Sequence, residues 1–428
     1  LVVLLAVAVA AEEKVKFHGY HSFVVDEVSS DEVSIINSLC DTDQRMNQIV
    51  LMNDFLAPGM EAFLLVAPEH VQYVENTFAK FNIPYNVVGT DYQEQIDLVD
   101  EANTLARETW LADKARGVVR APDYYMTNAQ VNAWIADLAA SNAHVSSSNI
   151  GSSEEGRDIW EITIDGTTVS NPKHVYINGG IHAREWISPS TMIFIAHNVA
   201  LTAGGDFQRM RENYIWHIPP VINPDGYEYT HTNNRNWRKN RRNNAGSACF
   251  GVDQNRNWAK FFGGSGSSGD PCSDTYRGPS ALSEPENEAV AAQIRAIGGA
   301  NIVLYMDVHS YSQYWLVPWG GQSAKPPMYP DLKTCGDEAA VAIQAAEGRS
   351  FLVGTPPDIL YVAAGGALDW GHADDAGMGN VKYSYSPELR PATAGQGGFV
   401  IPPENIYPSG REIFAGCVAN IDCAERLP

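Results

Sequence analysis

The alternation of two hydrophobic patterns through residues 121–428 constrains the fold of this chain more than any other feature. Short apolar runs typical of buried strands occur at Ile159–Ile164, His174–Asn178, Ile215–Ile222, Ile302–His309 and Val381–Tyr385. Apolar residues recur at helical spacing in Asn128–Leu138, Ser190–Leu201, Glu284–Ile297, Cys335–Ala346 and Arg411–Ala424. Strands that alternate with helices over this length predict one large α/β domain with a mostly buried sheet.

Residues 12–92 carry a different pattern, in which strand, helix and strand follow each other twice. The predicted strands lie within Lys14–Val25, Ile49–Asn53, Ala62–Val66 and Tyr85–Val88. The predicted helices are Asp31–Asn47, which Ser29 or Ser30 would cap, and Pro68–Phe81. This β-α-β-β-α-β order predicts a small α+β domain of the ferredoxin-like type.

Residues 93–120 connect the two domains. Their many charges and helical periodicity predict a helical connector, which carries the basic residues Arg107, Lys114, Arg116 and Arg120. Exposed connectors of this kind are preferred sites of proteolysis, so we expect a protease to cut here.

The N-terminal residues predict export. Leu1–Ala10 is apolar and ends in the small-x-small triplet Ala8-Val9-Ala10, which is followed by two acidic residues. This pattern predicts that residues 1–11 are the remnant of a secretory signal peptide. The alternative is a buried N-terminal strand.

The cysteines agree with an oxidising compartment. The chain has six and no Cys-x-x-Cys pair, which argues against a zinc finger or a thioredoxin-like site. Cys249 and Cys272 are placed to form a disulfide across a Gly/Ser-rich stretch. The other pairings stay open, and Cys40 is expected to be a buried thiol.

The charge of the chain excludes several kinds of partner. Its formal net charge is −22, so it repels nucleic acid and anionic lipid surfaces. It contains no apolar run of about 20 residues, so no transmembrane helix is expected. Neither a nucleic-acid nor a membrane partner is therefore predicted.

Polar residues follow two of the predicted strands. His182 and Glu185 come soon after His174–Asn178, and His309 closes the run that begins at Ile302. Sites in α/β folds lie where strands end, and two imidazoles with one carboxylate suit Zn²⁺ with one position left open. Taken singly, His182 and Glu185 also fit a surface ion pair, and His309 also fits a hydrogen-bonded core histidine.

These residues stand in the order of a known family's motifs. His182-x-x-Glu185, His309 in His-Ser-Tyr-Ser-Gln and Pro387-Glu388-Leu389-Arg390 resemble the secreted zinc metallocarboxypeptidases of the carboxypeptidase A/B family. The resemblance continues through Asn234–Lys239, Gly251–Trp258, and Tyr361 ahead of Gly365–Trp370. It implies a large mixed sheet with helices on both faces in residues 121–428. It also implies an inhibitory propeptide in residues 12–92 and an activation site in residues 93–120.

The resemblance also implies the catalytic roles. His182, Glu185 and His309 would hold one Zn²⁺, and Glu388 would act as the general base. Arg238 would polarise the scissile carbonyl. An ion pair between Glu388 and Arg390 is the alternative for Glu388, since residues two apart on a strand share a face.

Substrate-binding roles follow in the same way. Asn255 and Arg256 would hold the terminal carboxylate of the substrate, because a planar guanidinium binds a carboxylate with two hydrogen bonds. Tyr361 would close over the bound C terminus. Arg184 and Tyr311 look like subsite residues for the penultimate side chain.

One residue of the resemblance bears on specificity. In this family the residue ahead of an Asp-Trp pair forms the floor of the specificity pocket, and here it is Leu368. An apolar floor predicts a preference for C-terminal apolar or aromatic residues. Ala367 departs from the hydroxyl that many members carry, and Asp358 or Asp369 is an alternative source of negative charge that would favour basic residues.

The sequence thus predicts the secreted zymogen of a monomeric zinc exopeptidase that acts on peptide C termini. Its expected partners are a trypsin-like activating protease and proteinaceous carboxypeptidase inhibitors. Alternatives are basic-residue specificity, a carboxypeptidase-like binding protein without catalysis, and a zinc deacylase or amidase. A non-catalytic relative would lack a ligand or the base, and all four residues are present here.

Overall fold

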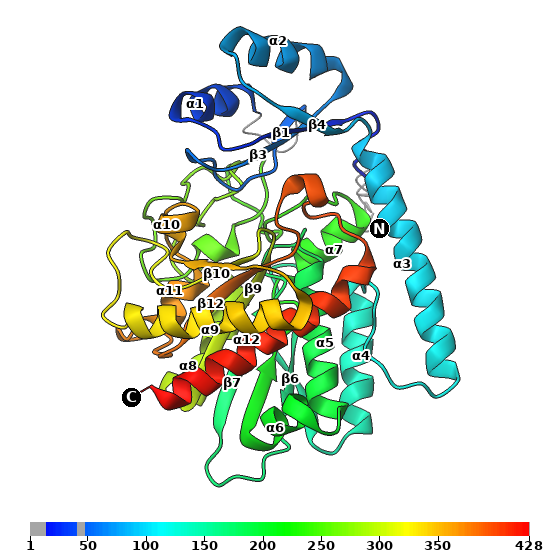
Figure 1. The fold of residues 1–428 in the computed structure, drawn as a ribbon, viewed down its shortest axis with the longest axis vertical. Coiled ribbons are helices and arrows are strands. Elements are labelled where there is room, and N and C mark those ends of the chain that lie inside the picture. Colours follow the sequence, from blue (N-terminus) through cyan, green and yellow to red (C-terminus); the bar gives the residue numbers. More distant parts are fainter. Residues whose placement is uncertain (1–13, 41–47, 428) are drawn as a thin grey trace, which may run out of the picture.

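The computed structural model describes residues 14–40 and 48–427. The predicted signal remnant and the last residues of the predicted helix Asp31–Asn47 lie outside these ranges. Figure 1 shows a small domain seated on one end of a much larger one, with a long helix running down the side of both. No helix of the described residues is both long enough and apolar enough to cross a membrane.

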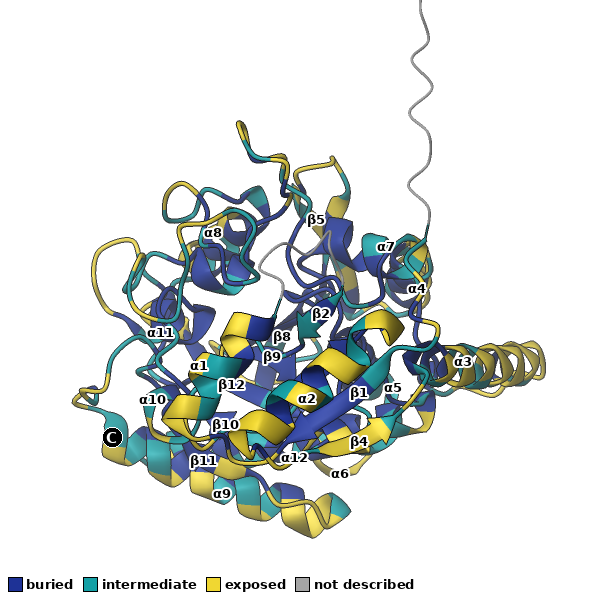
Figure 2. Ribbon diagram, turned by 90° about the horizontal axis from the view of Figure 1, so that it is seen from above, coloured by how far each residue is buried: buried dark blue, intermediate teal, exposed yellow. Residues whose placement is uncertain are grey.

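The small domain has the predicted order of elements. Its strands β1 (His21–Val25), β2 (Ile49–Leu51), β3 (Ala62–Val66) and β4 (Asn86–Gly89) form an antiparallel sheet in the order β2-β3-β1-β4. Helices α1 (Ser30–Leu39) and α2 (Val71–Phe81) cover one face of this sheet and expose their outer sides (Figure 2). The α+β prediction is therefore confirmed.

Two boundaries in this domain differ from prediction. The first strand covers only His21–Val25 of the predicted segment Lys14–Val25. Helix α1 ends at Leu39, and the backbone of the next residue, Cys40, is extended. At the start of the helix, the Ser29 side chain accepts a hydrogen bond from the Glu32 N–H. Cys40 is half-buried rather than buried.

The connector is one 24-residue helix, α3 (Tyr92–Ala115). Asp91 caps it by accepting hydrogen bonds from two backbone N–H groups of the first turn. Only one stripe of α3, including Ile96, Val99 and Trp110, packs against the large domain. A helical connector was expected over residues 93–120, but the helix ends at Ala115. Residues 116–120, which include Arg116 and Arg120, are therefore not helical.

The large domain is built on an eight-stranded mixed sheet in the order β11-β10-β12-β9-β7-β8-β6-β5. The parallel centre consists of β12 (Ser384–Leu389), β9 (Ile302–Ser310), β7 (Lys173–Gly179) and β8 (Tyr214–Ile218). The flanking strands are β5 (Val145–Ser152), β6 (Asp158–Ile164), β10 (Tyr314–Leu316) and β11 (Leu352–Gly354). The mixed sheet is as predicted, but β12 begins three residues later than the predicted Val381–Tyr385.

Helices cover both faces of this sheet. One core contains side chains of α4 (Asn128–Ser141), α5 (Ile187–Leu201), α9 (Tyr329–Glu347) and α12 (Ile406–Arg426). The other contains side chains of α8 (Pro285–Ile297) and α11 (Ala367–His372). On β7, Val175 and Ile177 belong to the first core and Tyr176 to the second, as the alternation of side chains along a strand requires. The remaining helices are α6 (Gly205–Asn213), α7 (Pro224–Thr232) and α10 (Pro356–Ile359).

Two disulfides lie in the large domain. Cys249 is bonded to Cys272, as expected, and Cys335 is bonded to Cys423. The second bond joins α9 to α12 across a sequence separation of 88 residues, which the sequence alone did not reveal. Cys417 is a buried thiol.

Candidate active site

Adjacent parallel strands bring the three predicted metal ligands together. His182 and Glu185 lie in the loop between β7 and α5, and His309 lies near the end of β9. Because β7 and β9 pair side by side, with Gly179 opposite Val308, their carboxyl ends meet at one edge of the sheet. Ligand atoms of all three buried residues lie within 4.8 Å of one another.

The two imidazoles converge on a common point. The Nδ1 atoms of His182 and His309 are 3.1 Å apart and the ring centroids are 4.7 Å apart. His174 and His217, elsewhere on the sheet, have a shorter nitrogen separation of 2.9 Å but a longer centroid separation of 5.2 Å, as in-line hydrogen-bonded rings do. His182 and His309 therefore do not form an in-line hydrogen bond, and both Nδ1 atoms lie near the Glu185 carboxylate.

Glu185 completes this donor set. Its carboxylate lies 2.8 Å from Nδ1 of His182 and 3.3 Å from Nδ1 of His309, and it accepts from the Ser310 N–H at 3.1 Å. Burial alone would raise the pKa of Glu185, but the two imidazoles more than offset this and lower it. The lowered pKa keeps Glu185 ionised, as a carboxylate ligand of Zn²⁺ must be.

Two buried aspartates orient the imidazoles. Asp253 lies 3.2 Å from Nε2 of His182, and Asp307 lies 2.8 Å from Nε2 of His309. A carboxylate that accepts from one ring nitrogen leaves the other nitrogen free for a metal. Spacing did not single out these residues, although Asp253 stands in the Gly251–Trp258 motif and Asp307 precedes His309 by two positions on β9.

Glu388 lies beside this cluster. It stands opposite His309 in the parallel pairing of β12 with β9. Burial, reinforced by the charges of Glu185 and Asp54, raises the pKa of Glu388 well above its usual range. Arg390 forms its ion pair with Glu412 at 2.5 Å, so the alternative pairing of Glu388 with Arg390 is wrong.

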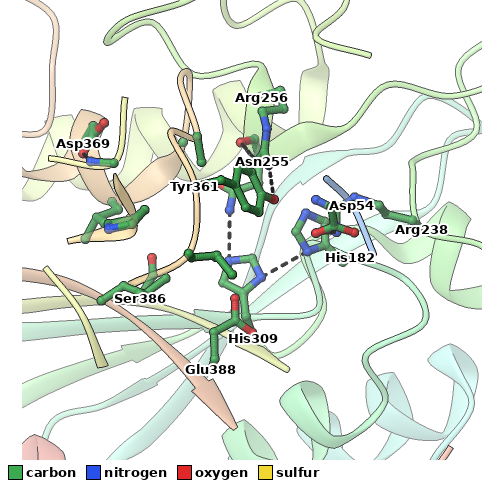
Figure 3. A pocket seen from close by; sticks show the side chains of 17 residues that line it. Asp54, His182, Arg238, Asn255, Arg256, His309, Tyr361, Asp369, Ser386 and Glu388 are labelled. Atoms are coloured by element: carbon green, nitrogen blue, oxygen red, sulfur yellow. Dashed lines mark hydrogen bonds and ion pairs between the residues drawn. The ribbon is translucent and has the colours of Figure 1, made fainter. Parts of the chain in front are cut away.

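Three predicted residues present nitrogen atoms to the same cavity, namely Arg238, Asn255 and Arg256 (Figure 3). The Arg238 guanidinium is fully buried and pairs with Asp253 at 2.9 Å. Arg256 donates to the Gly266 and Asn255 carbonyls, both at 2.8 Å, and Asn255 lies 3.1 Å from His309. Backbone and carboxylate contacts thus fix these donors before any substrate arrives.

Tyr361 closes one side of the cavity. Its hydroxyl accepts a hydrogen bond from Arg256 at 2.8 Å, and it is buried in this structure. Nearby, Gly365 has φ +80° and a Cβ there would lie 2.5 Å from the Arg256 carbonyl oxygen. The glycine thus allows the Tyr361 loop to pack closely against Arg256.

The predicted specificity residue Leu368 lines the same cavity. Its apolar companions there include Leu316, Leu360 and Ala363. Asp369 accepts hydrogen bonds from the N–H groups of Gly320 and Gly321, both at 2.7 Å, and burial raises its pKa to about 7. Ala367 is fully buried and its N–H donates to Asn255.

The small domain reaches into this site from above. Asp54 pairs with Arg184 at 2.7 Å and with Arg238 at 2.6 Å, and the ring of Phe55 lies 4.9 Å from that of Tyr361. Arg184 also donates to the Met52 carbonyl. Tyr311, the second predicted subsite residue, packs against Phe399 with ring centroids 4.9 Å apart. The sequence contained no signal for the roles of Asp54 and Phe55.

Comparison with known proteins agrees with this geometry. The family described as zinc carboxypeptidase matches residues 131–416, and the carboxypeptidase activation peptide matches residues 25–98. Zinc carboxypeptidase A 1 of Drosophila melanogaster is 32% identical over 98% of this chain and 95% of its own length. Carboxypeptidase B of Astacus astacus is 40% identical over 67% of this chain and 92% of its own length. The crystal structure of carboxypeptidase A from Helicoverpa armigera superposes with a TM-score of 0.80 at 27% identity, covering 96% of this chain and 98% of that one.

Fold, ligand cluster and matches together define a metallopeptidase made as a zymogen. The chain belongs to the zinc carboxypeptidase family and carries that family's activation peptide. The family's metal is Zn²⁺, and the donor set of His182, Glu185 and His309 fits it.

Proposed function

We propose that the chain, once activated, hydrolyses the last peptide bond of peptides and that Asn255 and Arg256 bind the terminal carboxylate. The observation that carries this proposal is one shared cavity, lined by Asn255, Arg256, His182, His309 and Glu388. A carboxylate anchored on Arg256 places the last peptide bond beside the metal ligands, which accounts for cleavage at the end of a chain rather than within it. An amidase whose substrates lack a terminal carboxylate would have no substrate group for Asn255 and Arg256 to bind.

Each remaining group has a chemical role in this proposal. Bound Zn²⁺ supplies Lewis-acid polarisation at the reacting centre. The Glu388 carboxylate takes a proton from the attacking water and passes it to the leaving amine. The Arg238 guanidinium, held by Asp253, donates hydrogen bonds to the carbonyl oxygen as negative charge develops on it.

The pocket supports a preference for apolar or aromatic C-terminal residues. Leu368 and its leucine neighbours offer an apolar surface, so burial of an apolar side chain contributes about 25 cal/mol per Å². Asp358 and Asp369, the two alternative sources of negative charge for the pocket, both have other partners. Asp369 is occupied by two backbone N–H groups, and Asp358 pairs with Lys325 at 2.5 Å.

The L368D variant tests the specificity. A carboxylate at the pocket floor neutralises a bound Arg or Lys side chain, so we expect kcat/KM for a substrate ending in Arg to rise about tenfold or more relative to one ending in Phe. V341D, at an exposed position on α9, adds the same charge away from the pocket. It should leave the ratio of kcat/KM for the Arg substrate to kcat/KM for the Phe substrate unchanged. A wild-type enzyme that prefers Arg over Phe would contradict the assignment.

The small domain is proposed to inhibit the enzyme by occupying its substrate-binding groups. The Asp54 carboxylate neutralises Arg184 and Arg238, which the proposal gives to the substrate. Phe55 packs on Tyr361, which holds its hydroxyl against Arg256. A substrate therefore cannot engage these residues until the small domain leaves.

The D54A variant tests this inhibition. Removing one partner from two partly buried ion pairs weakens docking of the small domain by about 1.5 kcal/mol, so residual activity of the uncut chain should rise about tenfold. Activity is measured on a small C-terminal substrate before any proteolysis. E69A removes an exposed charge of the same domain and serves as control. An unchanged residual activity in D54A would count against the proposed contact.

Activation is proposed to occur by cleavage within Lys114–Arg120, and this family's activation peptide implies activation by a protease. The helix ends at Ala115, and the following Val118 and Val119 side chains are 46% and 73% exposed. A trypsin-like protease can reach a basic residue in such a segment. N-terminal sequencing of the activated enzyme should find a new start between Arg107 and Tyr125, and a start outside this interval would refute the site.

Secretion is also proposed. Two disulfides are typical of a protein that matures in an oxidising compartment, and the apolar N-terminal residues have the composition of a signal peptide. The monomeric state and the binding of proteinaceous inhibitors stay predictions.

A further inference from the structure

An acidic cavity lies between the two domains of the uncut chain and reaches Glu185 of the metal-ligand cluster. Its volume is about 530 Å³, and both domains line it. The exposed residues Asp26 and Glu27 lie at its outer part. The buried residues Glu185 and Ser310 lie at its inner part. Of the three proposed metal ligands, Glu185 lines this cavity.

The charges that line this cavity all have one sign. Its acidic lining residues are Asp26, Glu27, Asp54, Glu61, Glu185 and Glu388. Glu185 is paired with two imidazoles, and the raised pKa of Glu388 favours its neutral form. No lysine, arginine or histidine is among its described lining residues. Asp54 is neutralised by two arginines, but the described residues provide no ion-pair partner for Asp26, Glu27 or Glu61.

Two further observations concern the polar groups of the cavity. The Ser310 hydroxyl, in a residue only 4% exposed, has no hydrogen-bond partner among the described residues. Burial raises the pKa of Glu61, and the negative charge of Asp26 adds to the effect, although the Ala394 N–H partly opposes it. The lining of the cavity thus includes one buried hydroxyl without a hydrogen-bond partner among the described residues.

We propose that this acidic cavity is the route by which a divalent metal ion reaches His182, Glu185 and His309 in the intact zymogen. A cleft lined by charges of one sign concentrates counter-ions and raises their association rate by about 10- to 1,000-fold. The same field repels the free carboxylate of a peptide substrate. The zymogen is thus open to its metal while it excludes its substrate. This inference rests on the proposed function for the identity of the metal ligands.

Metal uptake by the uncut chain tests the route. The metal-free zymogen is mixed with Co²⁺, and the visible absorption of bound Co²⁺ is followed in time without any peptide substrate. The triple variant D26N/E27Q/E61Q removes three charges from the cavity, and glutamine at position 61 keeps an oxygen to accept from the Ala394 N–H. We expect uptake about tenfold slower than in the wild type and a weaker dependence on ionic strength.

Two controls assign the signal. E69Q/E101Q/E108Q removes three exposed charges that do not line the cavity, and it should load at the wild-type rate. H309A should give no such absorption, which places the bound ion at the proposed ligands. Equal rates for the two triple variants, or a zymogen that takes up Co²⁺ only after proteolysis, would overturn the proposal. Because uptake is read without hydrolysis, this result is independent of whether the proposed peptidase activity is found.

Discussion

The H309A variant should lose both its zinc and its peptidase activity. His309 supplies one of three ligands, and its Nδ1 lies within hydrogen-bond distance of both other residues of the cluster. Loss of an outer-sphere partner alone costs about 10- to 100-fold in metal affinity, so loss of a ligand should cost more. We expect less than about a tenth of the wild-type zinc content after dialysis, and kcat/KM lowered by about 1,000-fold or more.

A histidine outside the cluster provides the control for this result. His174 lies in an in-line hydrogen bond with His217 on the same sheet, so H174A also removes a hydrogen-bonded imidazole. It should keep its zinc and its activity. Full zinc occupancy together with normal activity in H309A would contradict the ligand assignment.

The E388Q variant should separate catalysis from metal binding. Glutamine has nearly the same shape as glutamate but cannot take a proton from water. A positioned general base contributes about 10²- to 10⁴-fold, so we expect kcat to fall by about 1,000-fold while zinc content stays unchanged. Substrate affinity should change little, because Asn255 and Arg256 remain.

The matched control for E388Q is E404Q, which replaces an exposed glutamate of the same domain. It should behave as the wild type does. An E388Q enzyme with more than about a tenth of the wild-type kcat would show that another group acts as the base, and the proposed role of Glu388 would then be wrong.

The metal cluster could be predicted from sequence because the rule that places it is topological. His182, Glu185 and His309 follow the ends of two strands, and neighbouring parallel strands bring such ends together. Their roles still depended on the resemblance to a family, since each residue taken alone fits a structural reading. Asp253 and Asp307 act through the imidazoles, and no spacing along the chain reveals such a contact.

Errors in the predicted strands have a physical cause. Strand β12 was predicted at Val381–Tyr385 because its apolar residues lie there, whereas the strand runs through Ser386 and Glu388. Its polar end faces the active-site cavity, so function overrides the hydrophobic pattern that the prediction uses. The edge strand Val145–Ser152 was missed because most of its side chains are polar and only partly buried.

Contacts between the domains lay beyond any reading of the sequence. Asp54 stands in a turn after β2, and nothing in its neighbourhood indicates that it meets two arginines of the large domain. Likewise, the bond between Cys335 and Cys423 joins helices far apart in sequence. Such pairs are set by how the chain packs, not by local propensity.

Zinc-dependent cleavage by the activated chain should require a free terminal carboxylate on the substrate. The most direct measurement compares one peptide ending in Phe with the same peptide ending in Phe-amide, before and after trypsin treatment of the chain. We expect release of Phe from the free acid only, at a rate that rises after trypsin treatment and is lost when zinc is removed. Equal cleavage of the amide, cleavage at internal bonds, or activity that survives zinc removal would contradict the account.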